Sequence, residues 1–478
     1  MPVPPQALSV KRAQVEFHSF ASFGEPERVL RIYAEENVRR ANIIRKHREF
    51  IGAMSPFLEI GANAGHSSYM LANDFGADGF ALDLSADALR HGKALIDAWR
   101  LERAPVRIAG DAVRLPFQDS SLRLVVAFQM LSQFMDIESV FVEVKRVLAP
   151  GGIFLFAEEP LRRRLSLRLY RAPYVERMKP WERTLHRWGL LGYLARDPIG
   201  AEQEESFGIR QNHTLELRDW DRLVRRHFVE HRYEIFVPEQ GWGERVAKRV
   251  AVRLDPHRST WRAARLLGGT LAAVCRKEGQ PTAPVLVPAE FEVLLRCPDC
   301  GASLRRDHLD VLRCQRCPYQ AANEDGVYTL LPSAERAELY PGSRADLIDF
   351  ASPGHEDNLL EGWHQVEGVF GNKYRWMGPR ATARLARVRS GAQRLRIRGH
   401  APEEVFRNRG PVRIRVNVNG AAGGSWTLGR TGLFVLETDV PDAPEYHVEI
   451  LAEPAWIPPG DGRTLTVTIS MIRLVPAE

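Results

Sequence analysis

Short hydrophobic runs alternate with amphipathic segments through the first third of the chain. The runs predicted to be strands are bounded by turn residues, and they are 57–60, 79–84, 106–110, 122–128 and 153–159. The segments with apolar residues at helical spacing are 30–50, 64–75, 85–100 and 138–150, and Ser85 is predicted to cap the third of them. This alternation predicts right-handed crossovers and a parallel sheet that is covered by helices on both faces.

An insert at 161–211, basic and rich in aromatic residues, interrupts the alternation. The pattern then resumes with a helix and two strands predicted at 218–229, 233–238 and 269–276. We therefore expect residues 1–277 to form one α/β domain around a Rossmann-like sheet of seven strands. Three prolines follow at 278–290, which predicts a linker.

A different pattern, strict alternation of apolar and polar residues, begins at about 345. It predicts an antiparallel β-sandwich over 345–478, with strands at 393–400, 411–420, 433–440, 446–453 and 464–475. The alternation places Leu395, Ile397, Val412 and Ile414 in the core, and it leaves Arg394, Arg396, Arg398, Arg413 and Arg415 outside. Such a basic face suits an anionic glycan, although a solvated face has the same pattern.

Composition adds only mild constraints. The chain has 478 residues and a formal net charge of +6, a small excess that permits anionic partners but does not indicate DNA. The N-terminus lacks the layout of a signal peptide, and no apolar run reaches the ~18 residues of a membrane span. We expect a cytoplasmic protein. Arginines interleaved with Leu and Tyr at 161–180 fit a peripheral contact at the inner face of the membrane, or else a solvated helix face.

A glycine-containing loop, Gly61-Ala62-Asn63-Ala64-Gly65, follows the first predicted strand. The dinucleotide fingerprint needs glycine at three positions, and Asn63 and His66 occupy two of them, which counts against NAD. The loop also lacks the Gly-Lys-Ser/Thr of a phosphate-binding P-loop. A purely structural turn is the remaining alternative to a cofactor loop.

The region 30–277 resembles the class I S-adenosylmethionine (SAM)-dependent methyltransferases of type 11. Four pieces carry the resemblance: the acidic residue and loop at 59–65, the acidic end of the second strand, "GDAVRLPF" and "VLAPGGIFLFAEE". The resemblance implies that SAM is bound by Glu59, Gly61, Asn63, Gly65, Asp83, Leu84, Asp111, Ala112 and Phe128. The chemistry agrees, because glycines allow close backbone approach and a helix N-terminus attracts the methionine carboxylate.

Methyl transfer to a hydroxyl group also needs a base near the acceptor oxygen. The candidates are His213, after the insert, and Glu158, at the carboxyl end of the fifth strand; Glu159 is a further option. The alternatives are that His213 caps a helix and that Glu159 is a solvated loop residue. Many members of the resembled family carry two histidines where Ser132 and Gln133 stand, so the family does not identify the base here.

Four of the five cysteines form two close pairs. Cys297 and Cys300 are followed, after 13 residues, by Cys314 and Cys317, a spacing that predicts a tetrahedral zinc site. Sulfur fills every position, so the zinc is expected to be structural. Residues 291–333 resemble the small zinc-ribbon proteins that activate methyltransferases as partner subunits; a stabilising spacer is the alternative. Cys275 is expected to be a buried apolar residue.

Two stretches of the C-terminal region are "EGWHQVEG…YRWMGPRATARL" (361–385) and "PPGDGRTLTVTISMIRLV" (458–475). They resemble, more loosely, β-sandwich modules that are appended to bacterial glycosyltransferases and methyltransferases of surface-polysaccharide clusters. We therefore expect a small-molecule or glycan acceptor, such as a hydroxyl of a sugar or glycolipid. An RNA or ribosome methyltransferase is a less favoured alternative, since no RNA-binding module with stacking aromatics is evident. A non-catalytic binding protein on the same scaffold is the third. The sequence does not decide the acceptor, the methylated atom or the oligomeric state.

Overall fold

The computed structural model describes residues 8, 10–12, 14–15, 26–134, 136–162, 164, 167, 169–171, 178–196, 215–236, 245, 264, 268–282, 288–340, 345–350, 354–369, 372–388 and 390–477. These residues divide into two compact units. The first unit holds the described residues of 26–333, and the second holds those of 8–15 and 334–477. Within the described part of the chain, no helix is long and apolar enough to cross a membrane.

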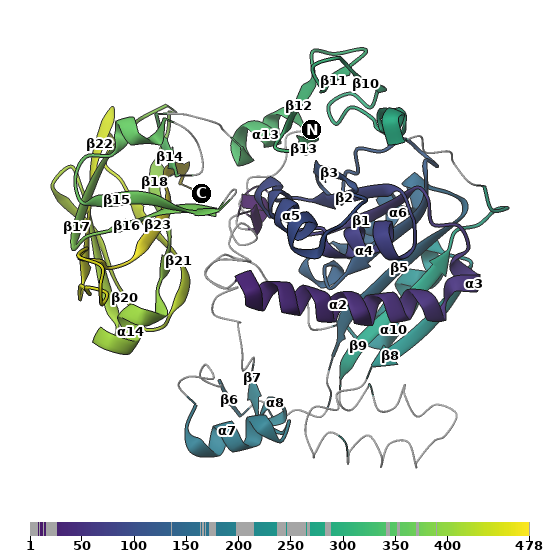
Figure 1. Ribbon diagram of the computed structural model, residues 1–478, viewed down its shortest axis with the longest axis horizontal. Coiled ribbons are helices and arrows are strands. Elements are labelled where there is room, and N and C mark those ends of the chain that lie inside the picture. The colour runs from purple at the N-terminus through teal and green to yellow at the C-terminus, as the bar shows by residue number, and fades with distance from the viewer. Residues whose placement is uncertain are drawn as a thin grey trace. The chain divides into compact units, whose positions relative to one another are not determined.

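The first unit is built on one sheet of eleven strands (Figure 1). Seven strands form its Rossmann-like part in the order β3-β2-β1-β4-β5-β9-β8. They are β1 (Phe57–Ile60), β2 (Gly79–Asp83), β3 (Val106–Ala109), β4 (Leu122–Phe128), β5 (Leu148–Leu161), β8 (Glu230–Phe236) and β9 (Gly269–Arg276). The strands β1 to β5 are parallel, but β9 is antiparallel to both β5 and β8. The prediction of parallel strands is confirmed for the five strands from which it was made, and the antiparallel β9 makes the complete sheet mixed.

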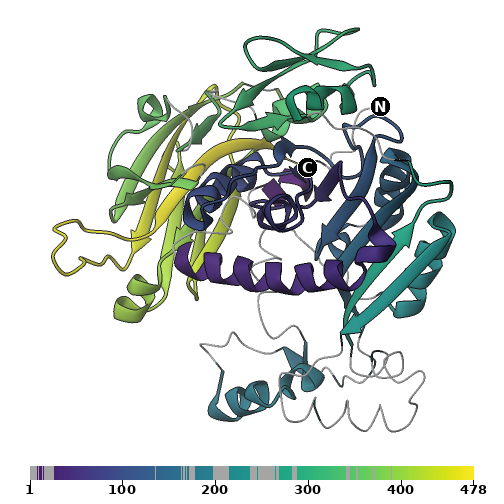
Figure 2. The same cartoon turned by 45° about the vertical axis from the view of Figure 1, so that its right-hand side comes forward.

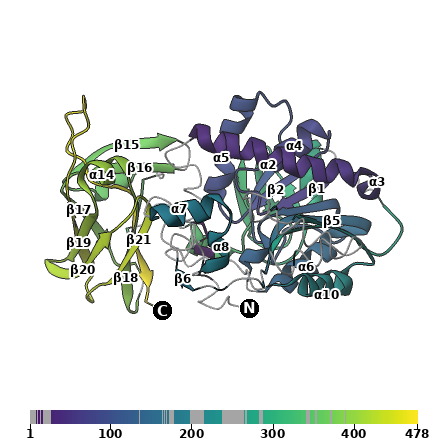
Figure 3. The ribbon, with the colours of Figure 1, turned by 90° about the horizontal axis from the view of Figure 1, so that it is seen from below.

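Helices cover both faces of this sheet (Figure 3). One face carries α2 (Pro26–Lys46), α3 (Arg48–Ile51), α4 (His66–Asp74) and α5 (Ala86–Trp99), and the other carries α6 (Ile137–Val147) and α10 (Leu217–His227). As predicted, Ser85 caps α5, because its hydroxyl accepts a hydrogen bond from the Ala88 N–H. The helices bury Ile44 and Met70 in the core on one face, and Phe141 and Trp220 in the core on the other.

The cysteine-containing segment contributes the remaining four strands of the sheet. They are β10 (Leu304–Arg306), β11 (Val311–Cys314), β12 (Gln320–Glu324) and β13 (Val327–Thr329). The strand β13 lies parallel to β3, and the Leu330 N–H extends the ladder by donating to the Ala109 carbonyl at 2.7 Å. Figure 2 shows this hairpin-rich segment at the top of the sheet. The strand β13 therefore pairs with β3 at the edge of the Rossmann-like sheet. Without this pairing, β3 would need to be covered or to carry charged side chains to avoid pairing with another chain.

The described parts of the insert form a small lobe. They comprise β6 (Tyr170–Arg171), α7 (Pro180–Arg187), α8 (Leu191–Leu194) and β7 (Ala195–Arg196). Met178, Leu191 and Ala195 are buried together in its centre, where they are packed against Tyr170 and Leu185.

The second unit contains two antiparallel sheets. The first sheet has the order β15-β16-β23-β18-β21, with β14 (Leu347–Asp349) paired to β23, and the second has the order β17-β22-β19-β20. The strands are β15 (Trp363–Val369), β16 (Asn372–Met377), β17 (Arg380–Ala386), β18 (Gln393–Ala401), β19 (Val412–Val418), β20 (Ala421–Leu428), β21 (Gly432–Asp439), β22 (Glu445–Glu453) and β23 (Thr468–Pro476). Short helices α13 (Ser333–Leu339) and α14 (Glu403–Arg409) accompany them. One core cluster draws residues from both sheets, including Leu395, Ile397, Val412 and Ile414 as predicted.

The arginines of this unit differ from the expected basic face. Arg413 and Arg415 are exposed, as predicted, and each lies 3.8 Å from Glu453. Arg394 and Arg396 both pair with Glu437. The prediction that Arg398 lies outside is wrong, because it is buried and donates from Nε to the Ser470 hydroxyl on β23. Alternation distinguishes two faces of a strand, but it does not show whether the outer face is covered.

Candidate functional site

The loop after β1 has a left-handed backbone at three positions. The φ angles are 68° at Gly61, 52° at Asn63 and 78° at Gly65. Asparagine is among the few non-glycine residues that tolerate this conformation, so Asn63 keeps the turn that a glycine would make. The Asn63 N–H donates to Asp83 Oδ2 at 2.8 Å, which ties the loop to the end of β2.

Three carboxylates lie at or just beyond the carboxyl ends of neighbouring parallel strands, on one side of the sheet. Glu59 is near the end of β1, Asp83 ends β2 and Asp111 follows β3. Asp83 also accepts the Ser85 N–H at 2.8 Å, and Asp111 accepts the Val113 N–H at 3.0 Å. These contacts orient both side chains from the backbone of the loops that follow them.

Glu59 is the most deeply buried of the three carboxylates. Its Oε2 accepts a hydrogen bond from the Ser68 hydroxyl at 2.5 Å, and the whole residue is 1% exposed. Burial raises the pKa of Glu59 to about 7, against a smaller opposing effect of the Ser68 hydrogen bond. The carboxylate is therefore poised to ionise when a cation is brought beside it.

The other predicted cofactor residues lie at the same edge. Leu84 follows β2, Ala112 is buried beside Asp111, and Phe128 ends β4. The Arg40 guanidinium of α2 lies 4.7 Å from the centre of the Phe128 ring. The fold thus brings together segments that are up to 69 residues apart, from Glu59 to Phe128.

The loop fits a bound group that approaches the backbone closely. The Asn63 Oδ1 atom is buried and has no hydrogen-bond partner among the described residues. A Cβ at Gly61 would lie 2.8 Å from the Met130 Cβ, so the position accepts no side chain without displacement. An unsatisfied buried acceptor beside a glycine cradle is what a polar cofactor requires.

A polar face of α2 completes the site, and the sequence analysis missed it. The Tyr33 ring stacks on the His66 ring at 4.1 Å, and Asn37 Nδ2 donates to the His66 carbonyl at 3.0 Å. Arg40 donates to the Ser67 hydroxyl at 2.8 Å and approaches His66 Nε2 at 2.6 Å. These α2 residues recur at helical spacing, so the available signal was a polar stripe on an otherwise amphipathic helix.

Two titratable groups at this contact, the partly buried Glu36 of α2 and the buried His66 of α4, influence each other. Burial would raise the pKa of Glu36, but the hydrogen bond with His66 and the charge of Arg40 outweigh it, and the pKa lies below its usual value. Burial lowers the pKa of His66, which favours the neutral ring. Through His66, Glu36 and Arg40 link α2 to the first turn of α4.

Glu158 and Glu159, at the end of β5, have different environments. Glu158 has a left-handed φ of 64° and pairs with Arg40 at 2.7 Å and Arg39 at 3.4 Å. Glu159 is fully buried, so the alternative of a solvated loop residue is wrong. Its carboxylate accepts the backbone N–H groups of Met130, Leu131 and Ser132 at 2.8–3.0 Å, which orders the turn after β4. His213 lies outside the described residues.

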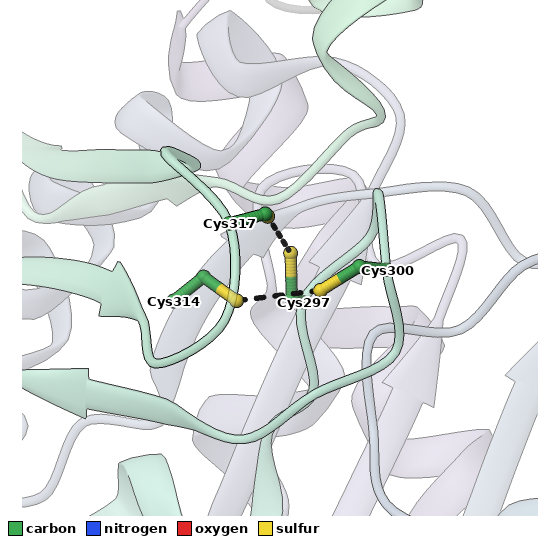
Figure 4. A group of neighbouring side chains, drawn as sticks. All are labelled: Cys297, Cys300, Cys314 and Cys317. Carbon is green, nitrogen blue, oxygen red and sulfur yellow. Dashed lines mark hydrogen bonds between the residues drawn. The ribbon is translucent and has the colours of Figure 1, made fainter.

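The four cysteine sulfurs form one cluster (Figure 4). They lie within 4.8 Å of one another, with Sγ–Sγ distances of 3.6 Å for Cys297–Cys317 and 3.4 Å for Cys300–Cys314. Zn–S bonds of ~2.3 Å in a tetrahedron give sulfur separations of about 3.8 Å. The donor set and its spacing therefore fit a zinc ion with four thiolates. Cys275 is fully buried elsewhere, as predicted.

Comparisons with known proteins find similarity to methyltransferases in the region that contains these site residues. Residues 58–156 match the family model described as a methyltransferase domain. The chain is 26% identical over 194 residues to tocopherol O-methyltransferase of Arabidopsis thaliana, covering 40% of this chain and 52% of that protein. It is 31% identical over 131 residues to a probable SAM-dependent methyltransferase of Mycolicibacterium smegmatis, covering 27% and 48%. The chain thus spans about half the length of these relatives.

Among solved structures, phosphoethanolamine N-methyltransferase 2 of Haemonchus contortus, in complex with SAM, aligns with 51% of this chain and 53% of that chain. The TM-score is 0.33 and the sequence identity is 16%.

Proposed function

We propose that the protein transfers a methyl group from SAM to a hydroxyl of a sugar or glycolipid acceptor. The observation that supports a SAM site is the convergence of Glu59, Asp83 and Asp111 on the edge that carries the left-handed loop. When bound, SAM supplies an electrophilic methyl group on a sulfonium, and an in-line displacement by the acceptor oxygen would consume it. The protein's main contribution is to hold the two reactants in that line.

Each edge residue has a defined task in this proposal. Gly61 and Gly65 allow the backbone to approach the methionine part, and the first N–H groups of α4 meet its carboxylate. Glu59 faces the cationic amino group. Asp83 holds the ribose hydroxyls, and Asp111 meets the adenine amino group.

Glu158 remains our candidate for a group beside the acceptor. Its Oε2 lies 2.7 Å from Arg40 and its Oε1 lies 3.4 Å from Arg39, so an acceptor hydroxyl must compete with both guanidinium groups for the carboxylate. We therefore propose that Glu158 acts as a base only if the acceptor displaces one of these arginines. His213 is the alternative base.

The cysteine cluster is proposed to hold a structural zinc. Because β13 pairs with β3, a folded ribbon would support the strand that leads into Asp111. The Gln118 N–H donates to the Leu294 carbonyl, and the Arg296 N–H donates to the Pro116 carbonyl. These hydrogen bonds also tie the segment after Asp111 to the ribbon. This arrangement supports an activating role within the same chain over a passive spacer.

Calorimetry with SAM tests the cofactor site. Wild type and Asp74→Asn, which changes an exposed carboxylate on α4, should bind SAM, and Asp83→Asn should bind at least about tenfold more weakly. If wild type does not bind SAM, the enzyme proposal is wrong and the non-catalytic alternative stands. If Asp83→Asn binds SAM as tightly as wild type, the assignment of Asp83 is wrong.

Labelled SAM tests the acceptor class. Incubation with cell-envelope extract should label material that resists nuclease and protease and is degraded by mild acid or glycosidases. Nuclease-sensitive label would replace the glycan proposal with the RNA alternative. Heat-inactivated protein is the control for label transferred by the extract itself.

Metal analysis tests the ribbon. Purified protein should carry one zinc per chain, which Cys300→Ser should lose and Cys275→Ala should retain. Loss of zinc should raise hydrogen exchange at Arg107 and Ala109 on β3, whose backbone groups face β13. Unchanged exchange there in the zinc-free variant would contradict the supporting role.

A further inference from the structure

The small lobe formed by the insert exposes apolar side chains that its own fold does not use. Trp181 and Trp188 are 49% and 48% exposed, and they are the exposed tryptophans among the described residues. Leu167 and Leu169 are each 70% exposed. Single exposed apolar residues are normal on a protein surface, but four within one small lobe indicate an interaction surface.

The helix α7 shows why these residues are not part of the lobe core. Glu182 is buried, and its carboxylate accepts the Lys179 N–H at 2.6 Å, while Leu185 packs on the lobe core. Trp181 and Trp188 are seven residues apart, so they lie within about 20° of each other around the helix. They form a stripe on the side that the core leaves free.

Basic residues occupy another part of the outward half of α7. Arg183 and Arg187, four residues apart, form a basic stripe together with Lys179, which precedes the helix. All three are exposed, and Arg187 lies about 100° around the helix from Trp188. In the described part of the chain, Arg187 has no ion-pair partner. Glu182, the acidic residue of α7, is turned inward. The outward half of α7 therefore combines tryptophan with exposed, positively charged side chains.

The segment before β6 adds to the same lobe. The N–H groups of Leu167 and Leu169 donate to the carbonyls of Tyr193 and Leu194, both at 2.7 Å. The Trp181 ring contacts the Tyr170 ring with centroids 5.8 Å apart, which joins this segment to α7.

We propose that this surface, defined by Leu167, Leu169, Trp181, Trp188 and the basic stripe of α7, docks on an anionic lipid bilayer. Tryptophan and leucine beside Lys and Arg are the composition of segments that lie in the membrane interface. A nucleic acid would use the charge but not the leucines, and an apolar protein groove would use the leucines but not the charge. A bilayer with anionic headgroups satisfies both.

The position of the lobe in the chain gives this docking a consequence. The insert leaves the sheet at Leu161, the carboxyl end of β5, and β1, β4 and β5 are parallel. The membrane-bound lobe would therefore be attached at the edge that carries the cofactor loop. Provided that the methyl-transfer proposal is correct, the acceptor is then a lipid-linked or amphiphilic molecule that reaches the site from the bilayer surface.

Vesicle flotation of the full chain tests the docking. The expected result is binding to phosphatidylcholine vesicles with about one quarter phosphatidylglycerol, weaker binding to pure phosphatidylcholine, and a decrease when salt shortens the Debye length to about 4 Å. Trp181→Ser/Trp188→Ser should weaken binding by at least about tenfold. The control Val229→Ser/Leu309→Ser removes equally exposed apolar side chains outside the lobe, and it should bind like wild type.

A charge pair of variants separates the electrostatic contribution. Arg183→Gln/Arg187→Gln should weaken binding to anionic vesicles by about thirtyfold. Arg413→Gln/Arg415→Gln, which changes exposed arginines of the second unit, should have no effect. The proposal is overturned if wild type does not bind at low salt, or if the tryptophan variant binds like wild type. It is equally overturned if the tryptophans instead support a dimer in light scattering or retain a nuclease-sensitive RNA.

Calorimetry with SAM on the same variants keeps the two proposals distinct. Normal SAM binding without vesicle binding would contradict the membrane proposal alone. Vesicle binding without SAM binding would contradict the methyl-transfer proposal alone.

Discussion

The glycine at position 61 provides the sharpest test of the cofactor loop. Its φ of 68° is left-handed, and a Cβ there would lie 2.8 Å from the Met130 Cβ and 2.9 Å from the Met130 Cγ. Gly76 has nearly the same φ, 65°, but its nearest neighbour is the flexible tip of Arg103, with Nη1 at 3.4 Å. The substitutions Gly61→Ala and Gly76→Ala therefore share the backbone strain and differ in the close contact.

The expected magnitudes follow from these distances. A left-handed alanine costs about 1 kcal/mol, so Gly76→Ala should lower the free energy of unfolding by that amount. Gly61→Ala should lose about 2 kcal/mol more, because Met130 cannot withdraw easily. The Met130 backbone N–H donates to the buried Glu159 carboxylate at 3.0 Å, so the loop at 61–65 must shift instead.

Denaturant unfolding and calorimetry with SAM measure the two effects together. Gly76→Ala should bind SAM like wild type, and Gly61→Ala should bind it at least about tenfold more weakly. Gly61→Val should abolish SAM binding. If both alanine variants lose the same stability and both bind SAM normally, close backbone approach at Gly61 is not part of the site.

Three further outcomes follow from the same region. Asn63→Gly should retain SAM binding within about tenfold in calorimetry, because glycine adopts the observed φ of 52° and only the side-chain contact is lost. Burial raises the pKa of Glu59 from 4.5 to about 7, so its contribution to stability is complete below pH 4.5 and is lost as the pH rises through 7. Urea unfolding of Glu59→Gln should therefore show a flatter pH profile over that range. An unchanged profile would contradict this. Arg40→Ala should lower the free energy of unfolding by about 3 kcal/mol, because it leaves Glu158 without its closest cation. Arg31→Ala, at an exposed position, should change the free energy of unfolding by less than about 0.5 kcal/mol. Equal losses would show that the Arg40–Glu158 pair does not stabilise the fold.

The elements of the first unit followed closely from local patterns. The strand predicted at 122–128 and that at 269–276 have the observed bounds, and Ser85 caps its helix as expected. These features depend on periodicity and capping within a few residues, which a sequence displays directly. The direction of β9 did not follow, since strand direction depends on how the chain returns after the insert.

Long-range pairing accounts for the remaining differences. The spacing of Cys297 to Cys317 predicted the cluster of sulfurs, but not that the ribbon would join the sheet through β13 and β3, more than two hundred residues apart. The solvated alternative for Glu159 and the exposed position of Arg398 were wrong for a related reason. Both residues are polar in sequence, and their burial depends on partners from distant segments.

By itself, the sequence determined the chemistry that the chain carries: a loop with left-handed positions, acidic residues after successive strands, and two cysteine pairs at zinc spacing. Those properties are local, because a few neighbouring residues set backbone conformation and ligand type. Only the tertiary structure decided which groups face each other. It placed the polar face of α2 on His66, paired Glu158 with Arg40 and left Trp181 outside the core of its lobe. Such contacts depend on the packing of whole elements, which no local pattern specifies.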